Sequence, residues 1–419
     1  MTTLHNLGFP RIGARRELKQ AVEAYWAGTL QQSELEHVGR SLRERHWTLQ
    51  TEAGLDVVPV GDFAWYDQIL EFSCLLGVVP PRFQQPHDQP VSLDTLFRMA
   101  RGRAPSGEPA AACEMTKWFD TNYHYIVPEL EADQDFRIAR ETLFEQVDEA
   151  RALNLDVKPV IPGPLTYLYL SKGESFDGAA DSAKLTLLEN LIPVYRALLQ
   201  RFADQGVTWV QIDEPILCLD LPDAWQRAYL RVYDQLAGAA SVKLLLATYF
   251  EGLRDNLFTA LQLPVAGLHL DRVRGADPLE QLLPRLGDKV LSLGVINGRN
   301  IWRADLDTLL ETLTPLKAQL GERLWLAPSC SLLHSPVDLD QEDRLDDELK
   351  SWLSFAKQKL DELAVLGGAL DGDDNVQPAL EAQRRAVAAR GQSRRIHNPA
   401  VGERMAASGQ VSRDRLSPF

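Results

Sequence analysis

The chain has 419 residues, enough for one large domain or for two to three ordinary ones. Its hydrophobic fraction of 45% and charged fraction of 25% are typical of a globular protein with a sizeable core. The net charge is −15, and the sequence shows neither a secretory-signal pattern nor an apolar run near membrane-span length. These features predict a cytoplasmic protein, with neither nucleic acid nor membrane as partner.

Eight short apolar runs recur along the chain, and amphipathic segments separate most of them. The runs cover residues 4–9, 56–60, 157–161, 207–212, 242–248, 265–270, 289–296 and 323–327. Parallel strands are buried on both faces and need helical crossovers, so this alternation predicts an α/β fold, a (β/α)8 TIM barrel. Functional residues are then expected in the loops that follow the strands.

The segments between the runs predict helices and one long insertion. Residues 14–26 and 30–53 have helical character, and 345–366 has the apolar spacing of a closing helix. The stretch 79–135, after the second strand, is too long to be an ordinary connection and is expected to be a functional insertion.

The last fifty residues differ in character from the rest. From Glu381 onward there are eight arginines, Arg413 and Arg415 among them, against three acidic residues, and apolar content is low. We therefore predict a barrel over 1–368 and an Arg-rich helical linker arm over 369–419. A basic arm can bind nucleic acid, but a basic helix more often lies against an acidic body.

Several strand ends carry residues with chemical potential. Asp213 and Glu214 could act as acid and base, as metal ligands or as structural caps. His269 and Cys330 are further candidate ligands, but the sequence does not show whether the three or four ligands of a zinc site converge. The four cysteines are widely spaced, without a CxxC pair.

A basic group follows the first strand: Arg11, Arg15, Arg16 and Lys19. A helix N-terminus already favours anions, so these cations could form a phosphate or polycarboxylate site. Lys117, in the insertion, is a further candidate cation, and the alternative for all of them is an ordinary solvated surface.

Taken together, these segments resemble one family, the cobalamin-independent methionine synthases (5-methyltetrahydropteroyltriglutamate–homocysteine methyltransferases). The resemblance covers essentially the whole chain. It rests on the stretches Leu7–Gly13, Arg16–Lys19, Met115–Tyr125, Trp209–Pro215, Thr248–Gly252, Ile296–Arg303, Ser329–Pro336 and Arg395–Val401.

The resemblance implies the N-terminal half of a two-barrel methyltransferase that makes methionine from homocysteine. The second barrel, which carries the zinc and the homocysteine site, has no counterpart here. The chain is thus expected to hold no cofactor, to need the missing C-terminal barrel as partner and to be inactive alone. By resemblance, the tail of 5-methyltetrahydropteroyltriglutamate binds at Arg16, Glu17, Leu18, Lys19 and Lys117. A row of carboxylates suits cations at a helix N-terminus.

By the same resemblance, Asp213, Glu214, His269 and Cys330 are expected to be structural or vestigial, with no catalytic residue and no metal ligand in this half. A second hypothesis is a stand-alone folate-tail-binding or interaction module that docks a separate partner. A third is a barrel hydrolase that uses Asp213 and Glu214.

Overall fold

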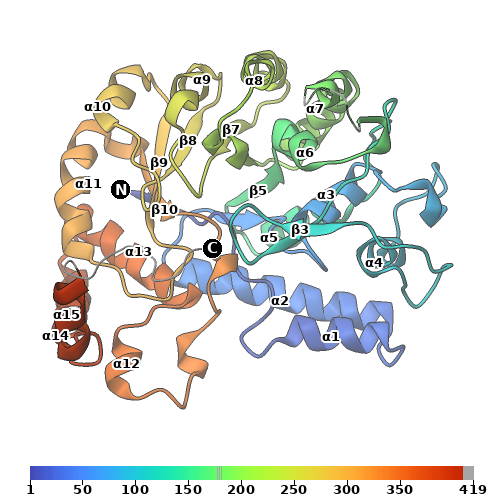
Figure 1. Ribbon diagram of the computed structural model, residues 1–419. Helices are drawn as coiled ribbons and strands as arrows, with labels where there is room; N and C mark the ends of the chain where they lie inside the picture. Colours follow the sequence, from blue (N-terminus) through green and yellow to red (C-terminus); the bar gives the residue numbers. More distant parts are fainter. Residues whose placement is uncertain (177, 179, 181, 409–419) are drawn as a thin grey trace, which may run out of the picture.

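Eight parallel strands form the centre of the molecule (Figure 1). The structure is a computed structural model that describes residues 1–176, 178, 180 and 182–408. The strands are β1 (Thr3–Leu4), β2 (Val58–Val60), β5 (Val157–Pro162), β6 (Trp209–Asp213), β7 (Lys243–Ala247), β8 (Gly267–Asp271), β9 (Val290–Ile296) and β10 (Leu324–Pro328). Their positions confirm the predicted α/β barrel.

The sheet curls so that its two end strands meet. The strand order is β1-β10-β9-β8-β7-β6-β5-β2, and every neighbouring pair is parallel. The seam between β1 and β2 is held by a parallel bridge from His5 to Val57. There, the Leu4 amide donates to Asp56 Oδ2 at 2.8 Å, and the Asp56 amide donates to the Leu4 carbonyl at 2.9 Å.

Helices surround the sheet, as crossover connections between parallel strands require. They are α1 (Glu17–Trp26), α2 (Gln32–Glu52), α3 (Gln68–Leu75), α4 (Leu93–Arg101), α5 (Thr142–Ala152), α6 (Pro164–Leu170), α7 (Leu188–Asp204), α8 (Asp223–Leu236), α9 (Leu257–Gln262), α10 (Leu279–Leu282), α11 (Leu306–Leu320), α12 (Asp347–Ser351), α13 (Ala356–Leu370), α14 (Gln377–Gln392) and α15 (Pro399–Ser408). In the part of the chain that the structure describes, none of these helices is both long and apolar enough to cross a membrane.

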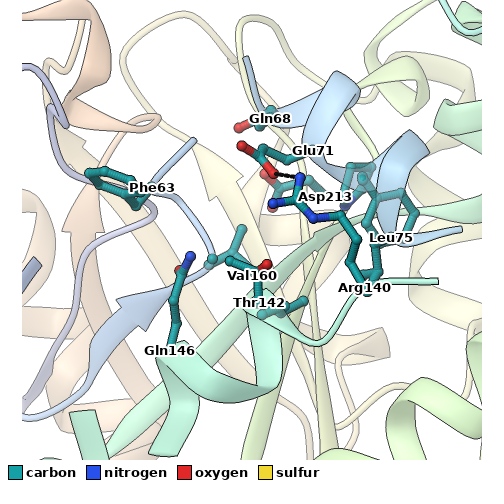
Figure 2. A pocket seen from close by; sticks show the side chains of 13 residues that line it. Phe63, Gln68, Glu71, Leu75, Arg140, Thr142, Gln146, Val160 and Asp213 are labelled. Atoms are coloured by element: carbon teal, nitrogen blue, oxygen red, sulfur yellow. Dashed lines mark hydrogen bonds and ion pairs between the residues drawn. The ribbon is translucent and has the colours of Figure 1, made fainter. Parts of the chain in front are cut away.

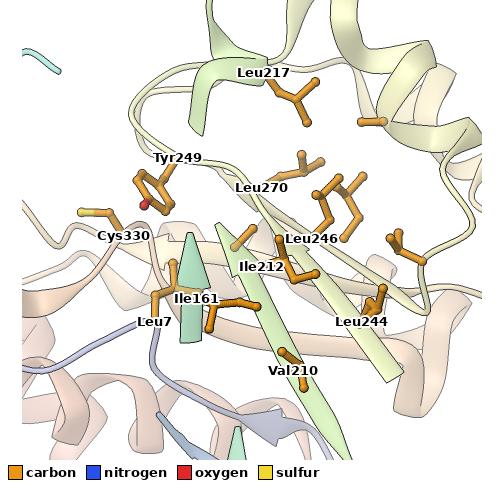
Figure 3. Packing of buried hydrophobic residues seen from close by; sticks show 14 of the residues in the cluster. Leu7, Ile161, Val210, Ile212, Leu217, Leu244, Leu246, Tyr249, Leu270 and Cys330 are labelled. Atoms are coloured by element: carbon orange, nitrogen blue, oxygen red, sulfur yellow. The ribbon is translucent and has the colours of Figure 1, made fainter. Parts of the chain in front are cut away.

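The side chains of each strand alternate between the helices and the barrel interior, as the period of a strand requires. The outward set packs under the helices as one large apolar core, and Figure 3 shows Ile161, Ile212, Leu246 and Leu270 within it. This core fixes the strands, so that the loops after them are held at one end of the barrel.

The insertion after β2 contains α4 and an antiparallel hairpin of β3 (Met115–Lys117) and β4 (His124–Ile126). Its apolar side chains join α1, α2 and α3 in a second core, in which Leu18, Trp65 and Phe97 are buried. The insertion is therefore a folded part of the protein that packs against α1, α2 and α3.

Two predicted elements differ from the observed ones. The first strand was expected over 4–9 but covers only Thr3–Leu4. The pairing continues to His5, whose amide donates to the Leu326 carbonyl at 3.1 Å, and beyond it the Gly8 amide donates to Asn6 Oδ1. The closing helix expected over 345–366 is two helices, α12 and α13. They are separated where Leu353 forms an antiparallel bridge with Trp302.

The arginine-rich arm lies against the barrel through α14. Gln383 is buried and donates from Nε2 to Glu362 Oε1 at 2.8 Å, while Arg384 pairs with Asp307 at 2.6 Å. Farther on, Arg395 pairs with Asp346 at 2.8 Å. These basic side chains thus face acidic partners on the barrel. The predicted arm extends to residue 419, but Arg413 and Arg415 lie outside the described residues.

Candidate functional site

The barrel interior is closed at its amino-terminal end by an apolar plug of Trp209, Leu245 and Trp325. The two indole rings lie 4.7 Å apart in an edge-to-face arrangement. All three plug residues are buried, so their side chains fill this end of the barrel interior.

A polar layer lies between the plug and the carboxyl ends of the strands. The Ser292 hydroxyl lies 2.7 Å from His5 Nε2 and 2.8 Å from His269 Nδ1, so it can donate to one ring and accept from the other. Burial lowers the pKa of His269 to about 3, and it lowers the pKa of His5 as well. Both imidazoles are therefore neutral packing groups at physiological pH.

Asp213 points into the same interior, and its carboxylate is hydrogen-bonded to other side chains of the protein. Its carboxylate accepts hydrogen bonds from Gln211 Nε2 at 2.7 Å and from the Tyr249 hydroxyl at 3.0 Å. Burial raises the pKa of Asp213 to about 6 and lowers the pKa of the nearby Lys158 to about 7. The Lys158 ammonium donates to the Asn6 carbonyl at 3.2 Å. This is an internal polar network in which each charge is compensated.

Glu214 does not share a site with Asp213. It follows the end of β6 and turns toward the helices. Its carboxylate accepts from the Thr166 amide at 2.9 Å, and from the Thr166 and Tyr229 hydroxyls at 2.6 and 3.0 Å. Burial raises the pKa of Glu214 to about 7. The pair is therefore not arranged as an acid and base facing one substrate.

Cys330, the remaining candidate ligand, and Asp271, at the end of β8, are also held in structural roles. Cys330 is fully buried, and burial raises the pKa of its thiol to about 12. Asp271 accepts from the amides of Phe250, Val273 and Arg274 and so organises the loop after β8. Across the described part of the chain, no three His, Cys, Asp or Glu side chains converge as metal ligands.

The carboxyl-terminal mouth of the barrel is covered by the tip of the β3–β4 hairpin. The Phe119 ring lies 5.9 Å from that of Phe250, which follows β7, and Tyr123 lies 6.2 Å from His334 in an edge-to-face contact. Trp118, at the start of the tip, is buried. These contacts close the place where a barrel enzyme ordinarily admits its substrate.

An open groove of about 410 Å³ remains beside the hairpin. One wall is the segment after β1, with Arg11 and Arg16, and Tyr123 of the hairpin also contributes. Arg11 is fixed there by a hydrogen bond to the Tyr66 carbonyl and by the Tyr123 ring, 5.4 Å away. The full lining is Pro10, Arg11, Ile12, Gly13, Ala14, Arg16, Tyr123, Leu333, Ser335, Pro336, Val337, Asp338, Gln341, Glu342 and Phe355.

The local backbone explains how Arg16 reaches the groove. Arg16 has φ 62°, a left-handed conformation, and its amide donates to the Gly13 carbonyl at 3.1 Å. A side chain at Gly13 would collide with the Glu17 carboxylate. This turn stops the helix expected from residue 14 and delays its start to Glu17.

The five residues expected to bind the folate tail have different surroundings. Arg16 lines the groove and is exposed. Lys19 is exposed on α1 and lies 3.7 Å from Glu23, and Lys117 is exposed on β3. Neither of these lysines lines the groove itself.

Glu17 and Leu18, the other two, are held in place by the protein. Glu17 pairs with Arg45 at 2.7 Å and accepts from the Arg15 amide at 2.9 Å. Leu18 is buried in the second core, and its amide donates to the Ile12 carbonyl at 3.2 Å. In this structure both stabilise the turn that presents Arg16.

The groove also contains residues that the sequence interpretation did not select. Asp338 and Glu342 bring negative charge to the wall opposite Arg16, and Gln341 accepts from Arg15 at 3.2 Å. Asp338 is partly neutralised by Lys357, 3.5 Å away. The segment 338–342 carries no motif that could have indicated this position. Tyr123 lies within the resembling stretch Met115–Tyr125 and could have been chosen there.

A second, smaller cavity of about 40 Å³ lies between α3, α5 and the ends of β2 and β5 (Figure 2). Arg140 pairs with Glu71 at 3.2 Å beside it, and Asp213 forms part of its lining. Its volume is that of a few water molecules. It is too small for a folate or an amino acid in this conformation.

Comparison with known proteins identifies the group to which these features belong. The family described as cobalamin-independent synthase, N-terminal domain, matches residues 3–321. A structure described as a vitamin-B12-independent methionine synthase from Listeria monocytogenes is similar, with a TM-score of 0.55 at 15% identity, over 87% of this chain and 96% of that chain.

Two further solved structures share the fold. A B12-independent methionine synthase from Shewanella sp. W3-18-1, in complex with selenomethionine, has a TM-score of 0.59 at 15% identity, over 91% of this chain and 99% of that one. A methyltransferase from Methanosarcina mazei has a TM-score of 0.51 at 12% identity, over 87% and 93%. At such identities the likeness establishes the fold alone.

Proposed function

The chain belongs to the cobalamin-independent methionine synthase family, matching its N-terminal domain, and on that premise we propose that it binds the polyglutamate tail of 5-methyltetrahydrofolate. The observation that carries the proposal is the groove beside α1, which presents the Arg16 guanidinium in an open space of about 410 Å³. Guanidinium groups bind carboxylates with charge-assisted hydrogen bonds.

The hairpin contributes Tyr123 to the groove and carries a further cation beside it. The Trp118 amide donates to the Tyr123 carbonyl at 2.7 Å, so Lys117 stands beside the residues that wall the groove. Lys19 lies one turn along α1 from Arg16. A tail of several carboxylates is long enough to contact cations both inside and just outside the groove.

The acidic residues of the groove limit where such a tail can lie. Asp338 and Glu342 would repel glutamate carboxylates, so the tail is expected to follow the side formed by Arg16 and the hairpin. This asymmetry makes the proposal sensitive to charge, since binding should weaken as salt screens the attraction.

The test is calorimetric titration with 5-methyltetrahydrofolate carrying three glutamates or one. We expect salt-sensitive binding that favours the triglutamate. Arg16→Ala and Lys117→Ala should each weaken it about fivefold to tenfold. The control is Arg227→Ala, an exposed arginine on α8, which removes the same charge elsewhere. Equal binding of both ligands, or equal losses in all three variants, would contradict the proposal.

We also propose that the methyl transfer needs a second, catalytic barrel and that this chain alone is inactive. The barrel mouth is covered by the hairpin, and the candidate acids of the interior are engaged in internal bonds. The zinc of the full-length family would belong to that partner, as would the homocysteine site. The described residues do not offer a converging donor set for it.

The partner's docking surface is proposed on the last part of the chain. Among the residues that the structure describes, half of the exposed large apolar side chains fall in two short stretches, 301–302 and 396–405. Trp302 and Ile396 line one groove there, beside Arg390. The working compartment is proposed to be the cytoplasm. The similar proteins named as synthases are matched over nearly their full length, so inactivity must be tested directly.

That test is an assay for methionine with purified chain, homocysteine and the triglutamate substrate, with added zinc. We expect no product above the rate without protein. Turnover in proportion to protein concentration would overturn the proposal of inactivity and would leave tail binding untouched.

A further inference from the structure

The β3–β4 hairpin is anchored at its base and depends on other contacts at its tip. At the base, the Ile126 amide donates to Asp67 Oδ2 at 3.1 Å, and Asp67 also caps α3. The tip, residues 118–123, extends beyond the paired strands and reaches across the barrel mouth.

Asp120 carries the ionic contact of the tip. Arg299 donates from one nitrogen to Asp120 Oδ1 at 2.9 Å and from another to the Asp120 carbonyl at 3.1 Å. Arg274 lies 3.4 Å from Oδ2. Arg299 is only 21% exposed and lies over the Phe250 ring at 5.0 Å, so it is a well-fixed partner.

The backbone on both sides of this contact is strained. Phe119, next to Asp120, has φ 51°, and Phe250, beneath Arg299, has φ 84°. Aromatic residues rarely adopt left-handed conformations, which persist where surrounding contacts hold them. The two rings meet across the contact that the ion pair closes. The tip is therefore held in place by contacts between segments more than 100 residues apart.

We propose that Asp120 is a positioning residue of the folate-tail site: bound to Arg299 and Arg274, it holds the hairpin so that Lys117 and Tyr123 stand at the correct distance from Arg16. This inference rests on the proposed function, because it assigns a role within the same site. Lys117 is three residues from Asp120, and Tyr123 is three residues on the other side.

Whether the loss of Asp120 weakens or tightens ligand binding distinguishes a positioning role from a direct electrostatic one. Asp120 has the same charge as the glutamate carboxylates of the ligand. If the residue acted only through its charge, its removal would tighten binding, because a repulsion would be lost. If it acts by holding the hairpin, its removal weakens binding, since the cation of Lys117 is no longer preorganised.

The experiment compares Asp120→Asn with Asp88→Asn in the full chain. Both changes remove one negative charge from the insertion, and Asp88 is exposed. We expect Asp120→Asn to weaken triglutamate binding roughly fivefold and Asp88→Asn to leave it unchanged. In a Lys117→Ala background, Asp120→Asn should have a smaller effect, because part of its effect is transmitted through that lysine.

A second measurement is independent of any ligand. Amide hydrogen exchange over residues 115–126 should be faster in Asp120→Asn than in the wild type or in Asp88→Asn. Unchanged exchange there would overturn the inference, even if tail binding is real. Tighter or unchanged triglutamate binding in Asp120→Asn would do the same. If the wild type binds neither folate but exchange rises in Asp120→Asn, the proposed function and this assignment fail while the Asp120 contact itself stands.

Discussion

His269 illustrates how a residue with catalytic potential can be reduced to a packing group. Its Nδ1 lies beside the Ser292 hydroxyl, and its Nε2 has no hydrogen-bond partner. A side chain at Gly294 would come within 2.9 Å of Nε2, so only glycine leaves room for the ring. The ring is buried, so protonation would place an uncompensated charge in the core.

This predicts a specific pH dependence. The folded pKa of His269, about 3, lies below the ordinary value of 6.5, so the unfolded chain binds the proton more readily. The stability contribution is therefore present above pH 6.5 and is lost as the pH falls toward 3. Lowering the pH from 7 to 5 should therefore reduce the free energy of unfolding by about 2 kcal/mol through this residue.

The measurement is urea unfolding of the wild type and of His269→Gln at both pH values. The variant should be less stable at pH 7 but should lose about 2 kcal/mol less on acidification. His37→Gln, at an exposed histidine of α2, is the matched control and should follow the wild type. Parallel pH profiles for wild type and His269→Gln would show that the residue is not buried in its neutral form.

At the scale of an element, Glu214 explains how α6 is held. This helix begins with Pro164, and its first amides point at the Glu214 carboxylate, which also accepts from Tyr229 and Tyr233 of α8 at 3.0 and 3.2 Å. A side chain at Gly163 would collide with that carboxylate. One buried acid thus joins a strand end to two helices.

Glu214→Ala should accordingly be severely destabilising. It leaves three hydroxyl groups and two backbone amides, those of Leu165 and Thr166, without their acceptor in a buried place, at a cost of about 3 kcal/mol. The free energy of unfolding from urea titration checks this. Glu189→Ala, at an exposed acid in the first turn of α7, should change it by less than about 0.5 kcal/mol. A loss below 1 kcal/mol for Glu214→Ala would mean that the carboxylate is dispensable.

The elements themselves were largely predictable, because each depends on a local pattern. Apolar runs located the strands, and the helical character of residues 14–26 located α1, which ends at Trp26 as expected. The errors occurred where a distant segment intervened. The break near Leu353 comes from pairing with Trp302, fifty residues earlier, and no local pattern signals such a contact.

At the scale of the whole molecule, the candidate site likewise depends on contacts between segments that are far apart in the sequence. The motif residues could be chosen from the sequence by resemblance, but their surroundings could not. Glu17 and Leu18 differ from Arg16 through burial and through partners such as Arg45, which belong to other helices. The closure of the mouth by Phe119 and Phe250 joins segments 131 residues apart. Asp338 of the groove lining follows β10, which neighbours β1 in the sheet but lies far from it in the sequence.

The seam of the barrel connects this global closure to the groove. β1 has only two residues, and beyond it the chain runs through His5 directly into the wall that carries Arg11 and Arg16. One side-chain contact across the seam is that of Asp56 with the Leu4 amide. Loosening the seam should therefore affect both the strand and the groove.

Asp56→Ala tests this coupling. Loss of the acceptor should destabilise the seam by about 1 kcal/mol, so the Leu4 amide should exchange with solvent about fivefold faster, while amides in β6 to β9 keep their protection. Glu52→Ala, an exposed acid at the end of α2, is the control. Triglutamate binding should weaken in Asp56→Ala and not in Glu52→Ala, because the wall of the groove continues from β1. Faster exchange with unchanged binding would show that Arg16 is held by its own turn, from Gly13 to Glu17, without support from barrel closure.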